Sequence, residues 1–150
     1  MTRRRLLEFM RAHVYAVQAS VGASGTPQGA VVGIVVTDDF EIFFDTMNDS
    51  RKAMNLRRSH AVAFVIGGTQ AGDERTVQYE GSADEPGGVD LQRLQAVYFE
   101  RFPDGRERQR LPGCLYFRVR PAWIRYSNFS RTPPEIVEVT SEQLRSSEWP

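Results

Sequence analysis

Short apolar runs, several of them alternating with polar residues, are spaced along the chain and predict strands separated by turns. The run AVVGIVV at 30–36 is continuously apolar and rich in β-branched residues, which predicts a strand buried on both faces. TDDF follows as a tight turn, so 30–46 reads as a hairpin. The predicted strands are 14–20, 30–36, 41–46, 60–68, 75–83 and two segments within 114–127 that are joined at Pro121.

Other segments show helical spacing of their apolar residues. Leu6, Phe9 and Met10 fall on one face of an opening helix, and 85–102 begins with turn residues and becomes helical. A short helix is expected at about 50–58, and 132–144 predicts an extended piece followed by one helical turn. The charged stretch 103–113 reads as an exposed loop.

The order of these elements favours a mainly β fold. The strands are joined mostly by short turns and lack the β–α–β alternation of a doubly wound sheet. A small antiparallel barrel with helices packed outside fits better. The 150 residues show no linker and no repeat, so we expect one domain over 1–150.

Composition narrows the possible partners. Lysine plus arginine number 19, as do aspartate plus glutamate, so no net charge attracts nucleic acid or an anionic membrane. No apolar run approaches the ~20 residues of a membrane span. Glu8 and Arg11 interrupt the apolar stretch near the N-terminus, which indicates an amphipathic helix, no export signal and a cytoplasmic protein. The lone Cys114 excludes an internal disulfide.

Several common chemistries lack their motifs. The chain has no G-x-x-x-x-G-K-[ST], no G-x-G-x-x-G, no His-Glu-x-x-His and no G-x-S-x-G. His13 and His60 stand far apart in sequence with no cysteine near either, so no metal site is expected.

Ser50, Arg51 and Lys52 stand where a predicted strand gives way to a predicted helix. The first N–H groups of a helix lack partners within the helix, and its dipole is positive there, so a phosphate can bind. A hydroxyl and two cations would add charge-assisted hydrogen bonds. The alternative is that Ser50 only caps the helix while both cations lie in water. The residues alone favour that alternative, because cations in a first helical turn are common.

Five stretches, in this order and spacing, resemble the pyridoxamine 5′-phosphate oxidase-like superfamily, whose members are split barrels that bind flavin mononucleotide (FMN). The stretches are GTPQGAVVGIVV, IFFDTMNDSRKAMNL, HAVAFVIGG, RTVQYEGSA and VRPAWIRYS. The resemblance covers about residues 5–140, and the tail is similar to the short, general-stress-protein-like branch. It implies an antiparallel, Greek-key-like split β-barrel with helices packed outside.

The resemblance also implies a flavin site. Arg51 and Lys52 would grip the flavin phosphate, and Ser50 would hydrogen-bond it. The remaining residues implied to meet the flavin are Asp45, Thr46, Thr76, Val31 and Val32. Family members hold the flavin between two subunits, so the resemblance implies a homodimer.

The substrate site departs from the family's pattern. True pyridoxamine 5′-phosphate oxidases carry an arginine, a lysine and a tryptophan where this chain has Ala30, Val35 and Ser127. They also end in an Arg-Leu-His motif that this chain lacks. The resemblance therefore implies a flavin-dependent oxidoreductase of unknown small-molecule substrate that does not oxidise a B6 vitamer. No catalytic side chain is assigned. The alternatives are a non-catalytic flavin-binding or sensing protein, a barrel that uses a deazaflavin or haem, and a dimer that has lost its cofactor.

Overall fold

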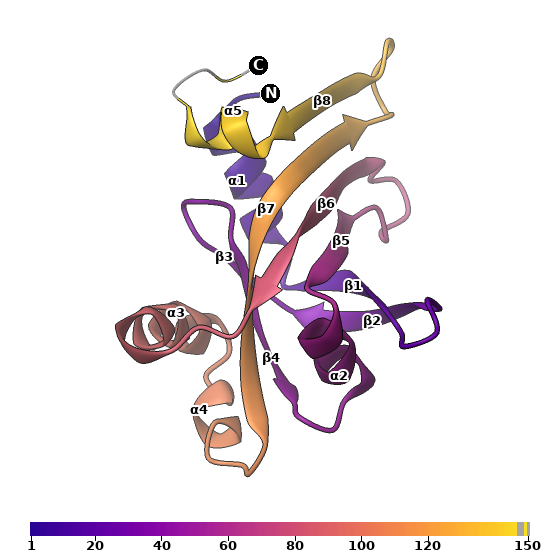
Figure 1. Cartoon of the computed structure of the whole chain (residues 1–150). Helices are drawn as coiled ribbons and strands as arrows, with labels where there is room; N and C mark the ends of the chain where they lie inside the picture. Colours follow the sequence, from indigo (N-terminus) through magenta and orange to yellow (C-terminus); the bar gives the residue numbers. More distant parts are fainter. Residues whose placement is uncertain (147–148, 150) are drawn as a thin grey trace.

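A computed structural model describes residues 1–146 and 149, which form eight strands and five helices (Figure 1). In chain order the elements are α1 (Arg3–Ala12), β1 (Tyr15–Val21), β2 (Pro27–Gly33), β3 (Val35–Val36), β4 (Ile42–Met47), α2 (Arg51–Arg58), β5 (Ala61–Gly67), β6 (Arg75–Asp84), α3 (Gly88–Arg101), α4 (Gly105–Arg108), β7 (Cys114–Asn128), β8 (Glu135–Thr140) and α5 (Ser141–Arg145). None of these helices has the length and apolar character that a membrane span requires.

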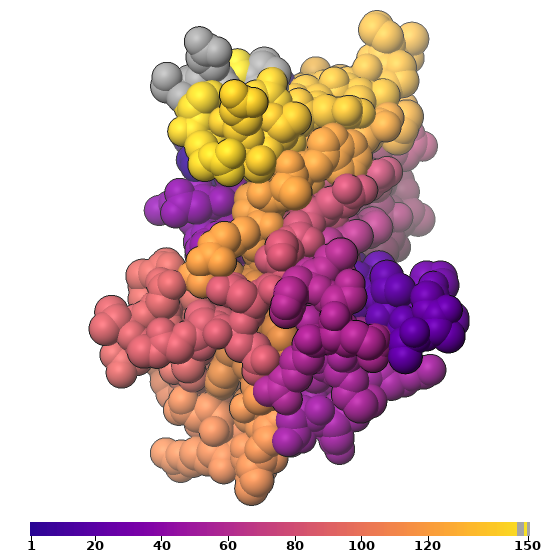
Figure 2. All heavy atoms as spheres, in the orientation of Figure 1, coloured from indigo at the N-terminus to yellow at the C-terminus, as the bar shows by residue number. Residues whose placement is uncertain are grey.

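The strands form a single antiparallel sheet in the order β2-β1-β5-β6-β7-β4-β3, and β8 pairs with the upper part of β7. The sheet curls into a split barrel, with α1, α2 and α3 packed outside it (Figure 1). Figure 2 shows β7 running diagonally across the visible face, from the α4 end of the molecule to the α5 end. The mainly β, split-barrel prediction is confirmed.

The prediction of one strand at 30–36, buried on both faces, is wrong. The segment divides at Ile34: β2 pairs with β1, and only β3 forms a hairpin with β4. Val31 is 67% exposed because it lies on the outer face of an edge strand. Gly33 sits at the division, where the Phe102 ring packs so closely that a Cβ would lie 2.8 Å from it. The segment 30–36 is continuously apolar because it contains parts of two strands, β2 and β3, which pair with different neighbours.

The strand over 114–127 is also unlike its prediction, because β7 is continuous through Pro121. Its pairing with β6 shifts register between Glu80 and Gly81, which leaves Ala122 without a direct partner. Such a bulge bends the strand and accommodates a residue that lacks an N–H. The bend lets β7 pair with β6, β4 and β8 at once.

Two apolar clusters hold the sheet and helices together. The larger fills the barrel, where Phe44 packs edge-on against Phe64. The smaller lies between the sheet and α3, where Phe43 stacks on Tyr116 and meets Tyr98 edge-on. Because successive residues of a strand face opposite sides, β4 serves both clusters and separates the α2 side from the α3 side.

Candidate functional site

The corner between β4 and α2 is tied together by two hydroxyl groups. Ser50 is the N-cap of α2, and its Oγ accepts a hydrogen bond from the Ala53 N–H at 3.2 Å. The same oxygen lies 2.9 Å from Thr46 Oγ1 near the end of β4. The capping role that the sequence allowed for Ser50 is therefore present, and it presets the first turn of the helix.

Arg51 and Lys52 have no ion-pair partner among residues 1–146 and 149. The first turn of α2 also contains no acidic residue, although carboxylates are the side chains that a helix N-terminus favours. Both charges therefore lie beside the positive end of the helix dipole, and the nearest carboxylate in sequence, Asp49 before the N-cap, makes no ion pair with either of them. An anion at this corner would offset the repulsion between the two cations and the helix dipole. It would also accept hydrogen bonds from the free N–H groups of the first turn.

A cavity of about 520 Å³ lies between α2 and the turn that joins β1 to β2. Arg51, Arg58, Asn55 and Gln28 line it, and no described lining residue carries a carboxylate. Asn55 Nδ2 donates to Gln28 Oε1 at 2.8 Å, and this bond fastens the helix to the strands. Arg51 and Arg58 are seven residues apart, so they lie on one face of α2 about 10 Å from each other. The cavity is thus suited to an anionic ligand.

Asp45 faces the other side of β4. Its carboxylate accepts a hydrogen bond from Arg108 Nε at 2.8 Å, and Arg108 also donates to the Tyr98 hydroxyl at 3.3 Å. Burial and the nearby Asp45 carboxylate raise the pKa of Tyr98 well above its usual value. The prediction that 103–113 is only an exposed loop is therefore wrong: it contains α4, and Arg108 ties it to β4.

The remaining residues of the predicted flavin site are spread over the sheet. Val32 is buried in the barrel, whereas Val31 lies on the outer face. Thr76 pairs with Gly67 at the end of β6 that lies away from α2 (Figure 1). One chain therefore brings Thr46, Ser50, Arg51 and Lys52 together and leaves Asp45, Thr76 and Val31 facing elsewhere.

An exposed apolar surface surrounds Val31. Val17, Val31 and Val65 are partners in register across β2, β1 and β5, and all three are exposed. Ala19, Gly29 and Ala63 form the next row. We call these six residues the outer valine face. Contiguous exposed apolar surface makes this face a candidate interaction site.

Sequence reasoning missed Gln18. It is fully buried on the inner face of β1, opposite Ala30, and neither its Oε1 nor its Nε2 has a partner among the described residues. A buried amide without partners is costly. Sequence reasoning also missed Arg58, although its spacing of seven from Arg51 could have placed both on one helix face.

Comparison with protein families finds one match over most of the chain. The family described as pyridoxamine 5′-phosphate oxidase matches residues 2–128, a range that runs from α1 to the end of β7. No curated protein matches the sequence.

Solved structures share the fold at low sequence identity. The haem-binding protein from Mycobacterium smegmatis has a TM-score of 0.82 at 13% identity, over 96% of this chain and 60% of that one. The haem storage protein HutZ from Vibrio cholerae has a TM-score of 0.70 at 20% identity, over 79% and 88%. A pyridoxamine 5′-phosphate oxidase-related, FMN-binding protein from Nostoc punctiforme has a TM-score of 0.66 at 14% identity, over 92% and 90%. This chain thus spans about three fifths of the length of the Mycobacterium protein.

Proposed function

We propose that this chain, which belongs to the pyridoxamine 5′-phosphate oxidase family, binds FMN at the corner between β4 and α2 and acts as a flavin-dependent oxidoreductase on a small molecule. The observation that carries the proposal is the pair of uncompensated cations, Arg51 and Lys52, at the N-terminus of α2. Arg51 also lines a cavity with no carboxylate among its described lining residues.

The phosphate of FMN suits this corner in charge and in geometry. Its oxygens can accept hydrogen bonds from the free N–H groups of the first turn and can pair with both cations. The Thr46–Ser50 contact holds the corner in shape before the ligand arrives. Arginine offers two parallel donors and lysine a movable charge, so the two side chains can hold different oxygens.

The ring of the flavin would lie along β2. This strand is at the edge of the sheet, so the side that faces away from β1 has backbone N–H and C=O groups without strand partners. Val31 can present these groups to the ring, because successive residues of an antiparallel strand turn them alternately to and away from the partner strand, and those of Val32 face β1. The flavin, when bound, supplies the electron transfer, and the protein binds and orients it. Asp45 pairs with Arg108, so we assign it to positioning the end of β4.

A second copy of the chain would complete the site. The outer valine face needs a cover, and a two-fold dimer covers it with the same face of its partner. A groove between two copies would also let residues that face apart in one chain, such as Arg51 and Thr76, reach one flavin.

Titration of the purified protein with FMN, riboflavin and haem tests the proposal. The fluorescence of FMN is expected to be quenched as it binds at one site per chain. Riboflavin, which lacks the phosphate, is expected to bind at least ~10-fold more weakly. Equal affinity for the two flavins would rule out the phosphate site. Tighter binding of haem would favour the second candidate, a haem-binding barrel, which the Mycobacterium and Vibrio neighbours support.

Two assays then separate an enzyme from a flavin-binding protein. Reduction of the bound FMN by NADH or NADPH on the stopped-flow timescale would support an oxidoreductase, and its absence with both donors would favour a non-catalytic role. Pyridoxamine 5′-phosphate is not expected to be oxidised, because Ala30 and Val35 replace the cations that true oxidases carry. Formation of pyridoxal 5′-phosphate would contradict this.

A further inference from the structure

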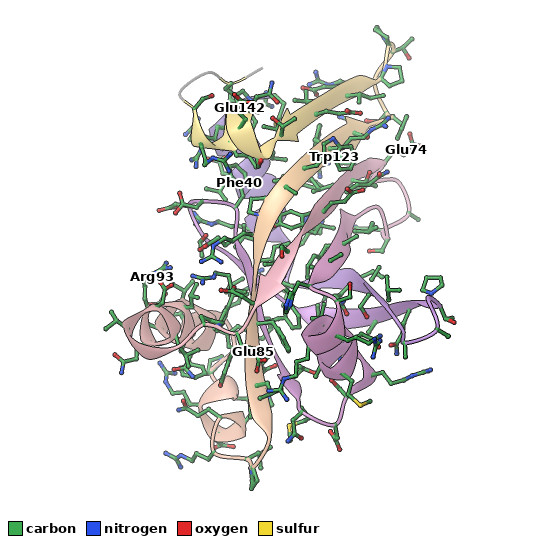
Figure 3. All side chains as sticks on the ribbon, viewed as in Figure 1. Phe40, Glu74, Glu85, Arg93, Trp123 and Glu142 are labelled. Atoms are coloured by element: carbon green, nitrogen blue, oxygen red, sulfur yellow. The ribbon has the colours of Figure 1, made fainter. Side chains whose placement is uncertain are left out.

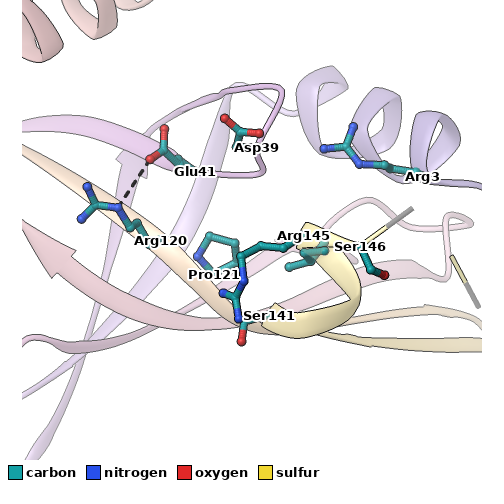
Figure 4. Close-up of a pocket in the computed structure, with 9 residues that line it drawn as sticks. Arg3, Asp39, Glu41, Arg120, Pro121, Ser141, Arg145 and Ser146 are labelled. Carbon is teal, nitrogen blue, oxygen red and sulfur yellow. Dashed lines mark ion pairs between the residues drawn. The ribbon is translucent and has the colours of Figure 1, made fainter. Parts of the chain in front are cut away.

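A second cavity, of about 590 Å³, lies beside α5 and the start of α1, at the end of the molecule away from α2 (Figure 1), and Figure 4 shows the residues that line it. Four separate segments form it: the start of α1, the turn between β3 and β4, the middle of β7, and α5. Its described lining residues are Arg3, Asp39, Glu41, Arg120, Pro121, Ser141, Leu144, Arg145 and Ser146. Its volume is within the range of small-molecule sites.

Some charged side chains in this cavity already form ion pairs with each other. Arg120 lies 3.8 Å from the Glu41 carboxylate, and Arg93 of α3 and the buried Arg118 are also 3.8 Å from it. Figure 3 shows Arg93 on α3 and Phe40 in the neighbouring turn, on the same side of β7. Three guanidinium groups therefore surround the Glu41 carboxylate, so we do not assign it to binding a ligand.

Two opposite charges in the cavity are free. Neither Arg145 of α5 nor Asp39 of the turn has a hydrogen-bond or ion-pair partner among residues 1–146 and 149. Arg3 is partly engaged: one nitrogen donates to the Asp38 carbonyl at 2.7 Å, and its guanidinium lies over the Phe40 ring. Among its described lining residues, the cavity thus presents one free cation, one partly free cation and one free carboxylate.

The turn that carries Asp39 is held rigidly. Phe40 has a positive φ of 60°, which is unusual for a residue with a bulky side chain. Its N–H donates to the Thr37 carbonyl, and its own carbonyl accepts from the buried Tyr79 hydroxyl at 3.1 Å. The Phe40 ring is fully buried and stacks on Trp149. Backbone strain that the surroundings enforce is common at ligand sites, and here these contacts fix the backbone of the turn from which the exposed Asp39 side chain extends.

We propose that this cavity binds a small zwitterion, which carries both a carboxylate and an ammonium group, of the kind represented by a free amino acid with an apolar side chain. Arg145, assisted by Arg3, would hold the carboxylate through parallel N–H donors. Asp39 would hold the ammonium group. Pro121 and Leu144 supply the apolar wall for the side chain. The proposal does not depend on flavin binding, because the two cavities share no lining residue.

Calorimetric titration with L-leucine tests it, beside N-acetyl-L-leucine, which has no ammonium group, and L-leucinamide, which has no carboxylate. Leucine is expected to bind at least ~10-fold more tightly than either analogue, because each analogue loses one charge-assisted contact. Arg145→Ala is expected to weaken leucine ~10-fold or more and to leave leucinamide nearly unchanged. Asp39→Asn is expected to weaken leucine similarly and to leave N-acetyl-leucine nearly unchanged.

Arg110→Ala is the matched control, because Arg110 is exposed near α4, outside this cavity. It is expected to leave all three affinities unchanged, and circular dichroism checks that each variant is folded. No heat of binding with leucine at about 10 mM would overturn the proposal, since that concentration exceeds any affinity of functional use. Equal affinity for the three probes, or unchanged leucine binding in both cavity variants, would overturn it as well.

Discussion

The hydroxyl oxygens of Thr46 and Ser50 lie 2.9 Å apart, and this contact joins the end of β4 to the N-cap of α2. One residue earlier, Asp45 pairs with Arg108 on the opposite face of the strand. The end of β4 is therefore fixed from both sides. A corner fixed in this way can hold two like charges, Arg51 and Lys52, close to a helix N-terminus without a partner.

Replacing either of these cations should weaken flavin binding without unfolding the protein. Arg51→Ala and Lys52→Ala each remove one charge-assisted contact, worth about 1.5–3 kcal/mol, so FMN affinity is expected to fall roughly ten- to a hundredfold. The melting temperature of the flavin-free protein should not fall, because a charge that opposes the helix dipole is lost. Fluorescence titration and thermal melting measure the two effects. Arg110→Ala is the control, and unchanged affinity in both variants would return Arg51 and Lys52 to the role of solvated surface charges.

A charge on the outer valine face should prevent dimer formation. The wild type is expected to sediment as a dimer of 17.0 kDa chains at micromolar concentration. Val31→Asp would bury a carboxylate against its own two-fold copy, so this variant is expected to sediment as a monomer. Val89→Asp changes a more exposed valine on α3 and should leave the dimer intact. A monomeric wild type, or a dimeric Val31→Asp, would show that this face is not the interface.

Removing the unpartnered amide of Gln18 should stabilise the fold. Gln18→Leu keeps the size of the side chain and removes two buried polar atoms, whose desolvation costs about 1–3 kcal/mol. The urea midpoint is therefore expected to rise. Gln109→Leu, at an exposed position, should change stability by less than about 0.5 kcal/mol. A lower midpoint for Gln18→Leu would mean that the amide is bonded in solution, to a buried water or to a ligand.

Stability should fall at acidic pH through the carboxylates around Arg118. This buried guanidinium donates two hydrogen bonds to Asp84 and one to Asp90, and lowers the pKa of both carboxyl groups. A carboxyl whose pKa is lower in the folded state stabilises the fold above its unfolded pKa, near 3.9, and this contribution is lost as the pH falls through the folded value. The free energy of unfolding is therefore expected to decline below about pH 4.

Arg118→Met tests the same group from the other side. Arg118→Met should lower the free energy of unfolding at pH 7 by up to about 3 kcal/mol. This is the low end of the range for breaking a buried ion pair, because the carboxylates left behind, Asp84 and Asp90, are partly exposed. The decline below pH 4 should become shallower in this variant. Urea unfolding from pH 3 to pH 7 measures both. An equally steep decline in wild type and variant would assign the acid sensitivity to other carboxylates.

Most elements of the fold could be predicted because their signals are local. The amphipathic spacing of Leu6, Phe9 and Met10 lies within α1 itself, and Ser50 caps α2 through an atom three residues from its donor. The corner with Arg51 and Lys52 could be predicted for the same reason, since the end of a strand and the start of a helix are adjacent in sequence. Its role in binding flavin stays a prediction that the experiments above test.

The amino-acid sequence by itself indicated the antiparallel barrel class, the approximate position of most strands and of α1, α2 and α3, and the two cations at the start of α2, because periodicity, turns and caps depend on near neighbours. Only the tertiary structure decided which strand pairs with which, and so which residues are covered. Val31 is exposed because β2 pairs with β1 and ends the sheet, and Arg108 meets Asp45 because α3 returns the chain to β4. Such long-range pairing is set by the packing of distant segments, and no local pattern of residues records it.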